Sequence, residues 1–376
     1  MLDADSHVME LPDFLTLFAD AADRPRMPDL GLGPVAQFYA MVSRGPDGYS
    51  RHPAERVQEM VALGDRLLEG PKFYEALGAF NPDERRTALD LLGFERQVVL
   101  PTLSSTAAFT AATDDERYAI ARAATRAMVD FCRHDERLLP VGVLPLHDPA
   151  RAPAEATAAI DAGAAVLWVP HMAAGGRSPG HLDLDPVWAV LAERRVPFAI
   201  HVGGAAIQVP PAWMENGRPL PTDWLGGAEN VRGKDMMALH HDVETWLGCL
   251  VLDGVFDRHP ALRGMVTELG AAFVPSMLGR LDYCVHAWKR SEPVLAALTR
   301  PPSETIIEHV RFTPYSHEDV GELIALSDPA LYLFSSDYPH REGGRAPVER
   351  FDAWLAGTDA ADRDRFFFAN GADLFG

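Results

Sequence analysis

The pattern of apolar and polar positions along the chain predicts strands and helices that alternate. Short apolar runs bounded by Gly, Pro or polar residues are typical of buried strands, and amphipathic stretches with helical spacing separate most of them. The strands are expected at residues 2–8, 93–102, 138–146, 164–170, 196–204, 262–268, 306–312 and 331–334.

The stretches between these runs predict helices, one of which ends at Gly163 as a C-cap. Strands that alternate with helices imply parallel pairing through right-handed crossovers, and eight such units close a barrel. We therefore expect an α/β fold, a distorted (β/α)8 TIM barrel that residues 1–376 form as a single domain. The helices are expected at 55–68, 82–92, 114–132, 150–162, 185–194, 243–256, 272–289 and 348–355.

Two long segments interrupt the alternation. Residues 9–92 and 204–236 follow the first and fifth predicted strands, and long irregular segments in compact domains are usually lids or binding loops. We expect them to be lid segments over an apolar pocket for an aromatic or polyketide-like substrate. A satellite core or a subunit interface would account for their aromatic residues equally well. These aromatics are Phe38, Tyr39, Tyr49, Phe73, Tyr74, Trp213 and Trp224.

Composition and charge exclude several classes of protein. The formal net charge is -20 and the Lys and Arg residues form no basic stripe, so nucleic-acid binding is not expected. No apolar run reaches the length that spans a membrane, and the start of the chain lacks a signal-peptide pattern. Cys132, Cys249 and Cys284 are far apart, which is typical of a reducing compartment. We expect a cytoplasmic protein.

Acidic and histidine residues occur at or just past the C-terminal ends of predicted strands, which converge on one mouth in a barrel. Asp3, Asp5 and His7 alternate along the first strand and are expected to share a face. Two imidazoles with one or two carboxylates suit Zn²⁺ or Mn²⁺. The alternative is that these residues are ordinary turn, cap or loop residues. The strand-end set is Asp5, His7, His201, Glu268 and Asp337.

Four motifs resemble those of the amidohydrolase superfamily, in particular its amidohydrolase-related (amidohydrolase 2) branch. That branch includes aminocarboxymuconate-semialdehyde decarboxylase and the resorcylate-type decarboxylases. The resemblance extends over nearly the whole chain and implies a distorted eight-stranded barrel with one divalent metal at its mouth. The motifs are Asp3-Ala4-Asp5-Ser6-His7, Phe198-Ala199-Ile200-His201, Gly254 to Pro260 leading to Glu268-Leu269-Gly270, and Ser336-Asp337-Tyr338-Pro339-His340.

The resemblance implies metal ligands at Asp5, His7, His201 and Asp337. The chain departs from the family pattern at the first strand, where the family has His-x-His or Glu-x-His. It departs again at the sixth strand, where the decarboxylases carry a catalytic histidine and this chain has Glu268. The fourth strand lacks the lysine that bridges two metals in other members, which indicates a single ion, with Zn²⁺ preferred to Mn²⁺.

Further roles follow from the same positions. Glu268 and Asp337 are the candidate catalytic residues, with Glu268 outside the ligand set as general acid or base. Arginine forks match carboxylates, so loop arginines and histidines near the mouth are candidates for substrate binding, although each could equally be a solvated loop residue. These candidates are His171, His240, His241, Arg341 and Arg345.

Three functions remain open from the sequence. The leading hypothesis is a metal-dependent hydrolase that acts on a small-molecule carbonyl or carboxylate substrate through metal-activated water, because Glu268 replaces the histidine of the decarboxylases. The alternative is a non-oxidative metal-dependent decarboxylase. A metal-free binding protein or cyclase on the same barrel is the third. The resemblance also implies a homodimer.

Overall fold

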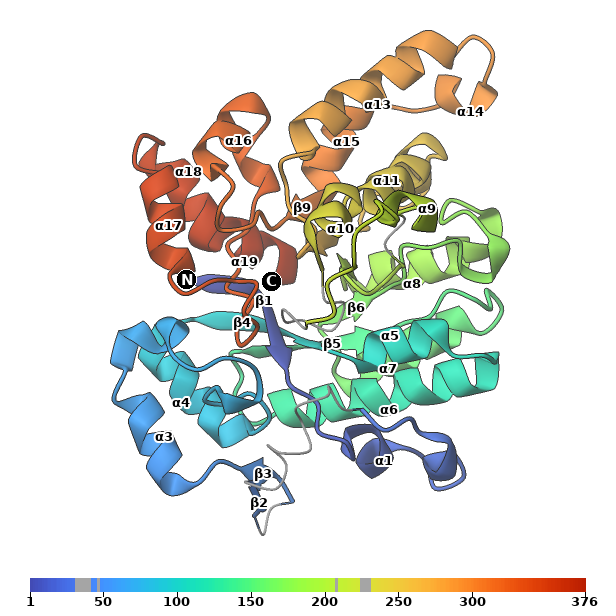
Figure 1. Cartoon of the computed structure of the whole chain (residues 1–376). Helices are drawn as coiled ribbons and strands as arrows, with labels where there is room; N and C mark the ends of the chain where they lie inside the picture. Colours follow the sequence, from blue (N-terminus) through green and yellow to red (C-terminus); the bar gives the residue numbers. More distant parts are fainter. Residues whose placement is uncertain (31–41, 46–47, 207–208, 224–230) are drawn as a thin grey trace.

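Seven parallel strands form one curled sheet in the order β1-β4-β5-β6-β7-β8-β9 (Figure 1). The structure is a computed structural model, and it describes residues 1–30, 42–45, 48–206, 209–223 and 231–376. The strands are β1 (Leu2–Val8), β4 (Arg96–Pro101), β5 (Leu138–Val143), β6 (Val166–Trp168), β7 (Phe198–His201), β8 (Gly264–Thr267) and β9 (Val310–Phe312).

The segment after β9 closes the sheet into a barrel, but not as the regular strand expected at 331–334. Parallel bridges join Phe312 to Tyr332 on one side and Ser6 to Tyr338 on the other. Residues Pro329–Leu331 form a 3-10 helix instead. The seventh predicted strand was also too long, because α15 (Pro302–His309) occupies its first half.

Helices between successive strands cover the outside of the sheet (Figure 1). Local sequence sets their ends. Asn81 caps the first of them by accepting from the N–H groups of Asp83 and Glu84, and Gly93 ends it with a φ of 67°. The covering helices are α4 (Pro82–Leu92), α6 (Asp114–Cys132), α7 (Ala152–Ala162), α8 (Asp185–Arg194), α11 (His241–Leu252), α12 (Val255–Arg258), α13 (Val274–Trp288) and α15.

Shorter elements occupy the segments between these helices and strands. The helix expected at 55–68 is α3 (Ala54–Val61) followed by a 3-10 helix (Gly64–Glu69), because Gly64 has a φ of 58°. The helix predicted at 348–355 is α17 (Pro347–Trp354). The remaining elements are α1 (Phe14–Phe18), the hairpin β2 (Ser43–Arg44) and β3 (Ser50–Arg51), α5 (Ser104–Thr110), α9 (Pro211–Met214), α10 (Gly233–Ala238), α14 (Pro293–Ala296), α16 (Val320–Leu326), α18 (Ala360–Asp364) and α19 (Asn370–Phe375).

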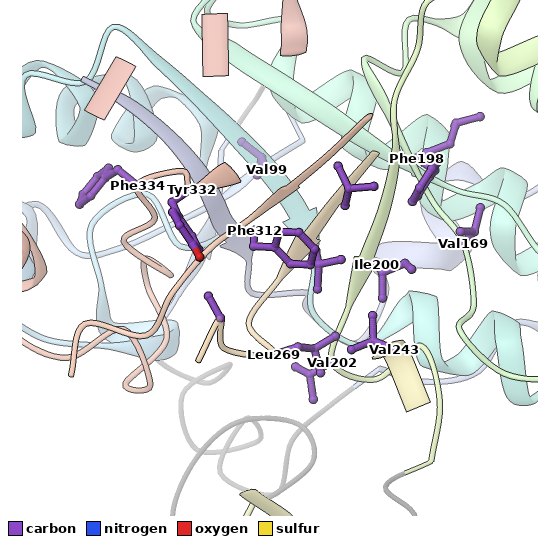
Figure 2. Packing of buried hydrophobic residues seen from close by; sticks show 14 of the residues in the cluster. Val99, Val169, Phe198, Ile200, Val202, Val243, Leu269, Phe312, Tyr332 and Phe334 are labelled. Atoms are coloured by element: carbon purple, nitrogen blue, oxygen red, sulfur yellow. The ribbon is translucent and has the colours of Figure 1, made fainter. Parts of the chain in front are cut away.

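The core has an inner and an outer layer. Alternate strand residues such as Leu100, Val141 and Met265 fill the barrel interior, and their neighbours face the helices. Figure 2 shows part of the outer layer around Phe198 and Phe312. Each large apolar side chain buried in this way contributes about 1.5–3 kcal/mol. Trp188, Trp246 and the bare backbone of Gly264 enclose the Phe198 ring.

The predicted lid segments are described only in part. Phe38, Tyr39 and Trp224 lie outside the described residues, so their contribution to a lid stays a prediction. Phe73 and Tyr74 are buried in the outer core layer, and Trp213 on α9 is exposed. In the described part of the chain, no helix combines the length and apolar character needed to cross a membrane.

Candidate metal centre

A register shift in β1 separates the three residues that alternate along it. The pairing of β1 with β4 changes between Asp3 and Ser6. The Asp3 carboxylate accepts hydrogen bonds from Gln97 Nε2 (2.8 Å), from the N–H of Ser336 (2.8 Å) and from its hydroxyl (2.6 Å). The expectation that Asp3 shares a face with Asp5 and His7 is therefore wrong, since a bulge re-aims the side chains beyond it.

Asp5, His7 and His201 meet at the barrel mouth, and all three are buried. His7 Nε2 lies 3.3 Å from Asp5 Oδ1 and 3.2 Å from His201 Nε2, and Asp5 Oδ2 lies 3.7 Å from His201 Nε2. Two atoms that bind one ion at about 2.0–2.2 Å lie about 3.0–3.6 Å apart. Both distances from His7 fall in this range and the third lies just above it, so the spacing of the three side chains is close to that of ligands around a single ion.

Asp337 reaches the same centre from the segment that closes the barrel. Its N–H donates to the Asp5 carbonyl at 2.8 Å, and its Oδ1 lies 3.5 Å from His7 Nε2. Its backbone is left-handed, with a φ of 52°. The strand-end positions noted in the sequence thus converge on one centre, and their roles as ligands stay a prediction.

Glu268 follows β8 directly and points into the centre. Its Oε2 lies 2.9 Å from His201 Nε2 and 4.0 Å from His7 Nε2. Its side chain is 11% exposed, whereas that of Asp5 is 1% exposed. Glu268 forms a group with Asp5, His7 and His201 whose ligand atoms all lie within 4.8 Å of one another. Its carboxylate is therefore near enough to bind an ion itself, in addition to the acid–base role predicted for it.

His340 also belongs to the centre, although the sequence assigned it no role. Its ring stacks on His7 with centroids 3.9 Å apart, and its Nδ1 lies 3.1 Å from Asp337 Oδ1. His340 Nε2 faces Thr102 Oγ1 at 3.2 Å, and that hydroxyl is also 2.8 Å from the carbonyl of Val8, to which it donates. Both ring nitrogens of His340 therefore act as donors, as in an imidazolium. Its place in the motif Ser336 to His340, three residues after Asp337, was the available signal.

The titration of His340 agrees with this geometry. Burial alone would lower the pKa of His340, but Asp337, followed by Glu268, outweighs burial and raises the pKa to about 9. Burial, followed by the neighbouring His340 and His201, holds the pKa of His7 well below 6.5, so His7 is neutral as a metal ligand must be.

Unpaired acid oxygens indicate that the centre fits a cation. Among the described residues, Asp5 Oδ1 and Asp337 Oδ2 are buried without a hydrogen bond, and Asp337 Oδ1 is paired with His340 Nδ1. No Lys or Arg forms an ion pair with either acid in the described part of the chain. Burial, with Asp337 and Glu268 adding to it, raises the pKa of Asp5 well above 3.8. His340 supplies one positive charge beside Asp337, and the other buried carboxylate needs a further counter-charge.

The tautomer of His201 supports the same conclusion. Its Nδ1 lies 2.7 Å from the carbonyl of Val202, so Nδ1 carries a proton and Nε2 is the nitrogen that faces Asp5, His7 and Glu268. This arrangement is the one by which metal-binding histidines are usually oriented. The centre therefore fits a divalent ion held by two imidazoles and two or three carboxylates.

The residues proposed for substrate binding lie outside this centre. His171 is buried, and burial followed by His201 lowers its pKa to about 3. His240 stacks on Phe273, and His241 is exposed. Arg341 and Arg345 are also exposed, with the guanidinium of Arg341 5.1 Å from the centre of the Phe73 ring. Contact with a substrate stays a prediction for each of the five residues.

Comparison of the sequence with known families assigns the chain. A family model described as amidohydrolase matches residues 24–376. The chain belongs to the amidohydrolase family. This family is one of enzymes, so within the third hypothesis, a metal-free binding protein or cyclase, the binding protein loses support. No curated protein matches the sequence.

Solved structures share the fold of this amidohydrolase. An amidohydrolase from Mycobacterium avium subsp. paratuberculosis is 23% identical, with a TM-score of 0.71 over 100% of this chain and 98% of that one. A variant of 5-carboxyvanillate decarboxylase from Novosphingobium aromaticivorans, with bound manganese and 3-methoxy-4-hydroxy-5-nitrobenzoic acid, is 20% identical (TM-score 0.64, 100% and 96% covered).

A third structure is dihydroxybenzoic acid decarboxylase from a Polaromonas species, with bound manganese and the inhibitor 2-nitroresorcinol. It is 18% identical, with a TM-score of 0.63 over 100% of this chain and 96% of that one. At these identities the likeness establishes the barrel fold, which confirms the fold class predicted from the sequence.

Proposed function

We propose that this amidohydrolase is a non-oxidative, metal-dependent decarboxylase of a small aromatic hydroxy acid. Two of the three similar structures described above are decarboxylases of aromatic acids that contain manganese. These relatives favour the decarboxylase alternative over the hydrolase, which was the leading hypothesis from the sequence.

The observation that carries the proposal is the arrangement around Glu268. Asp5, His7, His201 and Asp337 are the residues proposed to hold the ion, and a divalent ion bound there would offset the buried acids and polarise a substrate oxygen. Glu268 lies beside these residues and is more exposed than any of them. It is thus the acid of the centre that a substrate can approach most directly.

The proposed reaction needs one proton at a defined place. The bond between the ring carbon and the carboxylate breaks, carbon dioxide leaves, and the electron pair stays on the ring carbon. That carbon then takes a proton, which we assign to Glu268. His340 contributes by holding Asp337 through its Nδ1, while Thr102 fixes the other side of its ring.

Manganese is the first ion to test. The ligand set of imidazoles and carboxylates suits both Mn²⁺ and Zn²⁺. The preference for zinc drawn from the sequence has no support among the similar structures, because the two decarboxylases contain manganese.

Release of carbon dioxide tests the function directly. Metal-free, Mn²⁺-loaded and Zn²⁺-loaded protein would be incubated with 2,6-dihydroxybenzoate and 5-carboxyvanillate in deuterated water. We expect metal-dependent release of carbon dioxide and one deuterium at the vacated ring carbon. Glu268→Gln should lower turnover by about 10²–10⁴-fold with the ion retained, while Glu69→Gln, at an exposed position, should leave it unchanged.

Hydrolysis is the second candidate, and one observation favours it. Glu268 directly follows β8, at the position where the resemblance to the decarboxylases implies a catalytic histidine. A carboxylate there can accept a proton from water that attacks a carbonyl. Turnover of aromatic esters or lactones without release of carbon dioxide from any hydroxybenzoate would establish this function in place of the first.

A further inference from the structure

The backbone of Glu268 adopts a conformation that its residue type rarely adopts. Its φ is 51°, in the left-handed region that favours Gly and, less often, Asn or Asp. Strained residues of this kind persist only where surrounding structure holds them, and they concentrate at functional sites. Here the strained residue is the one whose carboxylate lies 2.9 Å from His201.

Side chains from the loop after β9 hold the Glu268 peptide from both sides. The Glu268 N–H donates to Thr313 Oγ1 at 3.3 Å, and the hydroxyl of Tyr315 donates to the Glu268 carbonyl at 2.7 Å. The two backbone polar groups of Glu268 are thus bound by side chains of this loop. A bond to each end of the residue fixes the direction in which its side chain leaves the strand.

A second carboxylate fixes the loop itself. Glu318 accepts hydrogen bonds from the N–H groups of Tyr315 (2.7 Å), Ala271 (3.0 Å) and Ala272 (2.8 Å). It therefore joins the loop after β9 to the start of the segment that follows Glu268. Gly270, with a φ of 71°, lets the Tyr315 ring approach, because a Cβ there would lie 3.1 Å from that ring.

We propose that Tyr315 is a positioning residue that holds Glu268 in its left-handed conformation and thereby aims the Glu268 carboxylate at the metal centre. Tyr315 lines a small cavity together with Asp5, Glu268 and Asp337, so it acts directly beside the centre. An ordinary phenol stays protonated at neutral pH and remains a donor to the carbonyl. The catalytic consequence rests on the function proposed for Glu268, whereas the structural consequence does not.

Kinetics of Tyr315→Phe test the catalytic consequence. Removing the hydroxyl should lower kcat about tenfold, the effect expected from one lost hydrogen bond, with KM and manganese content within twofold of the unchanged protein. The matched control is Tyr283→Phe on α13, because Tyr283 is 62% exposed and far along the chain from the loop. Its kcat should not change. A Tyr315→Phe protein with full kcat would overturn the proposal.

A double variant separates positioning from a general effect on the fold. If Tyr315 acts through Glu268, Tyr315→Phe should change kcat by less than twofold when Glu268→Gln is already present. Tenfold losses that multiply in the double variant would show that Tyr315 acts independently of Glu268 and would overturn the proposal.

A crystal structure of Tyr315→Phe gives an answer that needs no activity. We expect Glu268 to leave the left-handed region and its carboxylate to move away from His201. An unchanged Glu268 backbone and carboxylate would refute the positioning role. If the unchanged protein releases no carbon dioxide from any hydroxybenzoate but Glu268 is displaced in the Tyr315→Phe crystal structure, the proposed function is refuted. The positioning role of Tyr315 then stays in place.

Discussion

Replacing Glu10 by Gln should change how the stability of the protein depends on pH. Glu10 lies just past β1, is fully buried, and accepts hydrogen bonds from the N–H groups of Thr102 (3.1 Å), Leu103 and Ser104 (3.0 Å). Burial raises the pKa of Glu10 from 4.5 to about 7, and the bonds at Ser104, Leu103 and Thr102 offset burial only in part.

The size of the effect follows from these two pKa values. A difference of one in pKa corresponds to about 1.4 kcal/mol, so the rise from 4.5 to about 7 corresponds to roughly 3 kcal/mol. The folded state binds the Glu10 proton more tightly than the unfolded state does. The stabilisation is therefore complete below pH 4.5 and is lost as the pH rises through about 7. Roughly 2.5 kcal/mol of the change falls between about pH 5 and pH 8.

Urea denaturation at pH 5, 6, 7 and 8 measures the change. The free energy of unfolding of Glu10→Gln is subtracted from that of the unchanged protein at each pH, which cancels the titration of all other acids, including those of the metal centre. The difference should fall by roughly 2.5 kcal/mol across this range. Glu69→Gln, at an exposed position, should give a constant difference. A constant difference for Glu10→Gln would show that the Glu10 carboxyl group of the unchanged protein has the same pKa in the folded and unfolded states.

Three further predictions concern the core, the metal and the assembly. Gly264→Ala should destabilise the protein by about 1–3 kcal/mol in urea, because its Cβ would lie 2.1 Å from the enclosed Phe198 ring, and adding Phe198→Leu should restore part of the loss. His201→Ala should lower the manganese content found by elemental analysis, whereas His286→Ala, at an exposed position, should not. Equal manganese contents in the two variants would contradict the proposed ligand set. Light scattering at micromolar concentration should give the mass of a homodimer, and a monomer mass would disprove that prediction.

The sequence predicted the fold class well because the barrel depends on local patterns. Apolar runs and helical spacing recur along the chain, and α4 and α6 have the predicted bounds, set by Asn81 and Gly93 for the first and by Thr113 at the start of the second. Strand ends in a parallel barrel converge, so His201 and Asp337 could be placed near one another without knowledge of any contact.

The features that the sequence missed depend on long-range contacts. The separation of Asp3 from Asp5 and His7 depends on its partners Gln97 and Ser336, which are distant along the chain. The contribution of His340 depends on Thr102 and on stacking against His7. No periodic pattern encodes such contacts, because they arise only when the ends of several strands are brought together.

Barrel closure and the metal centre depend on the same hydrogen bonds. The segment that replaces a regular eighth strand donates from Asp337 N–H to the Asp5 carbonyl (2.8 Å), and the carbonyl of Tyr338 accepts from the N–H of His7 (2.8 Å). A regular strand would not allow the φ of 52° at Asp337, which lets its N–H pair with β1 while its carboxylate turns toward His7. Asp is among the few residue types that tolerate this conformation. The irregular closure is therefore what brings an acid from one end of the chain beside the histidine at the other.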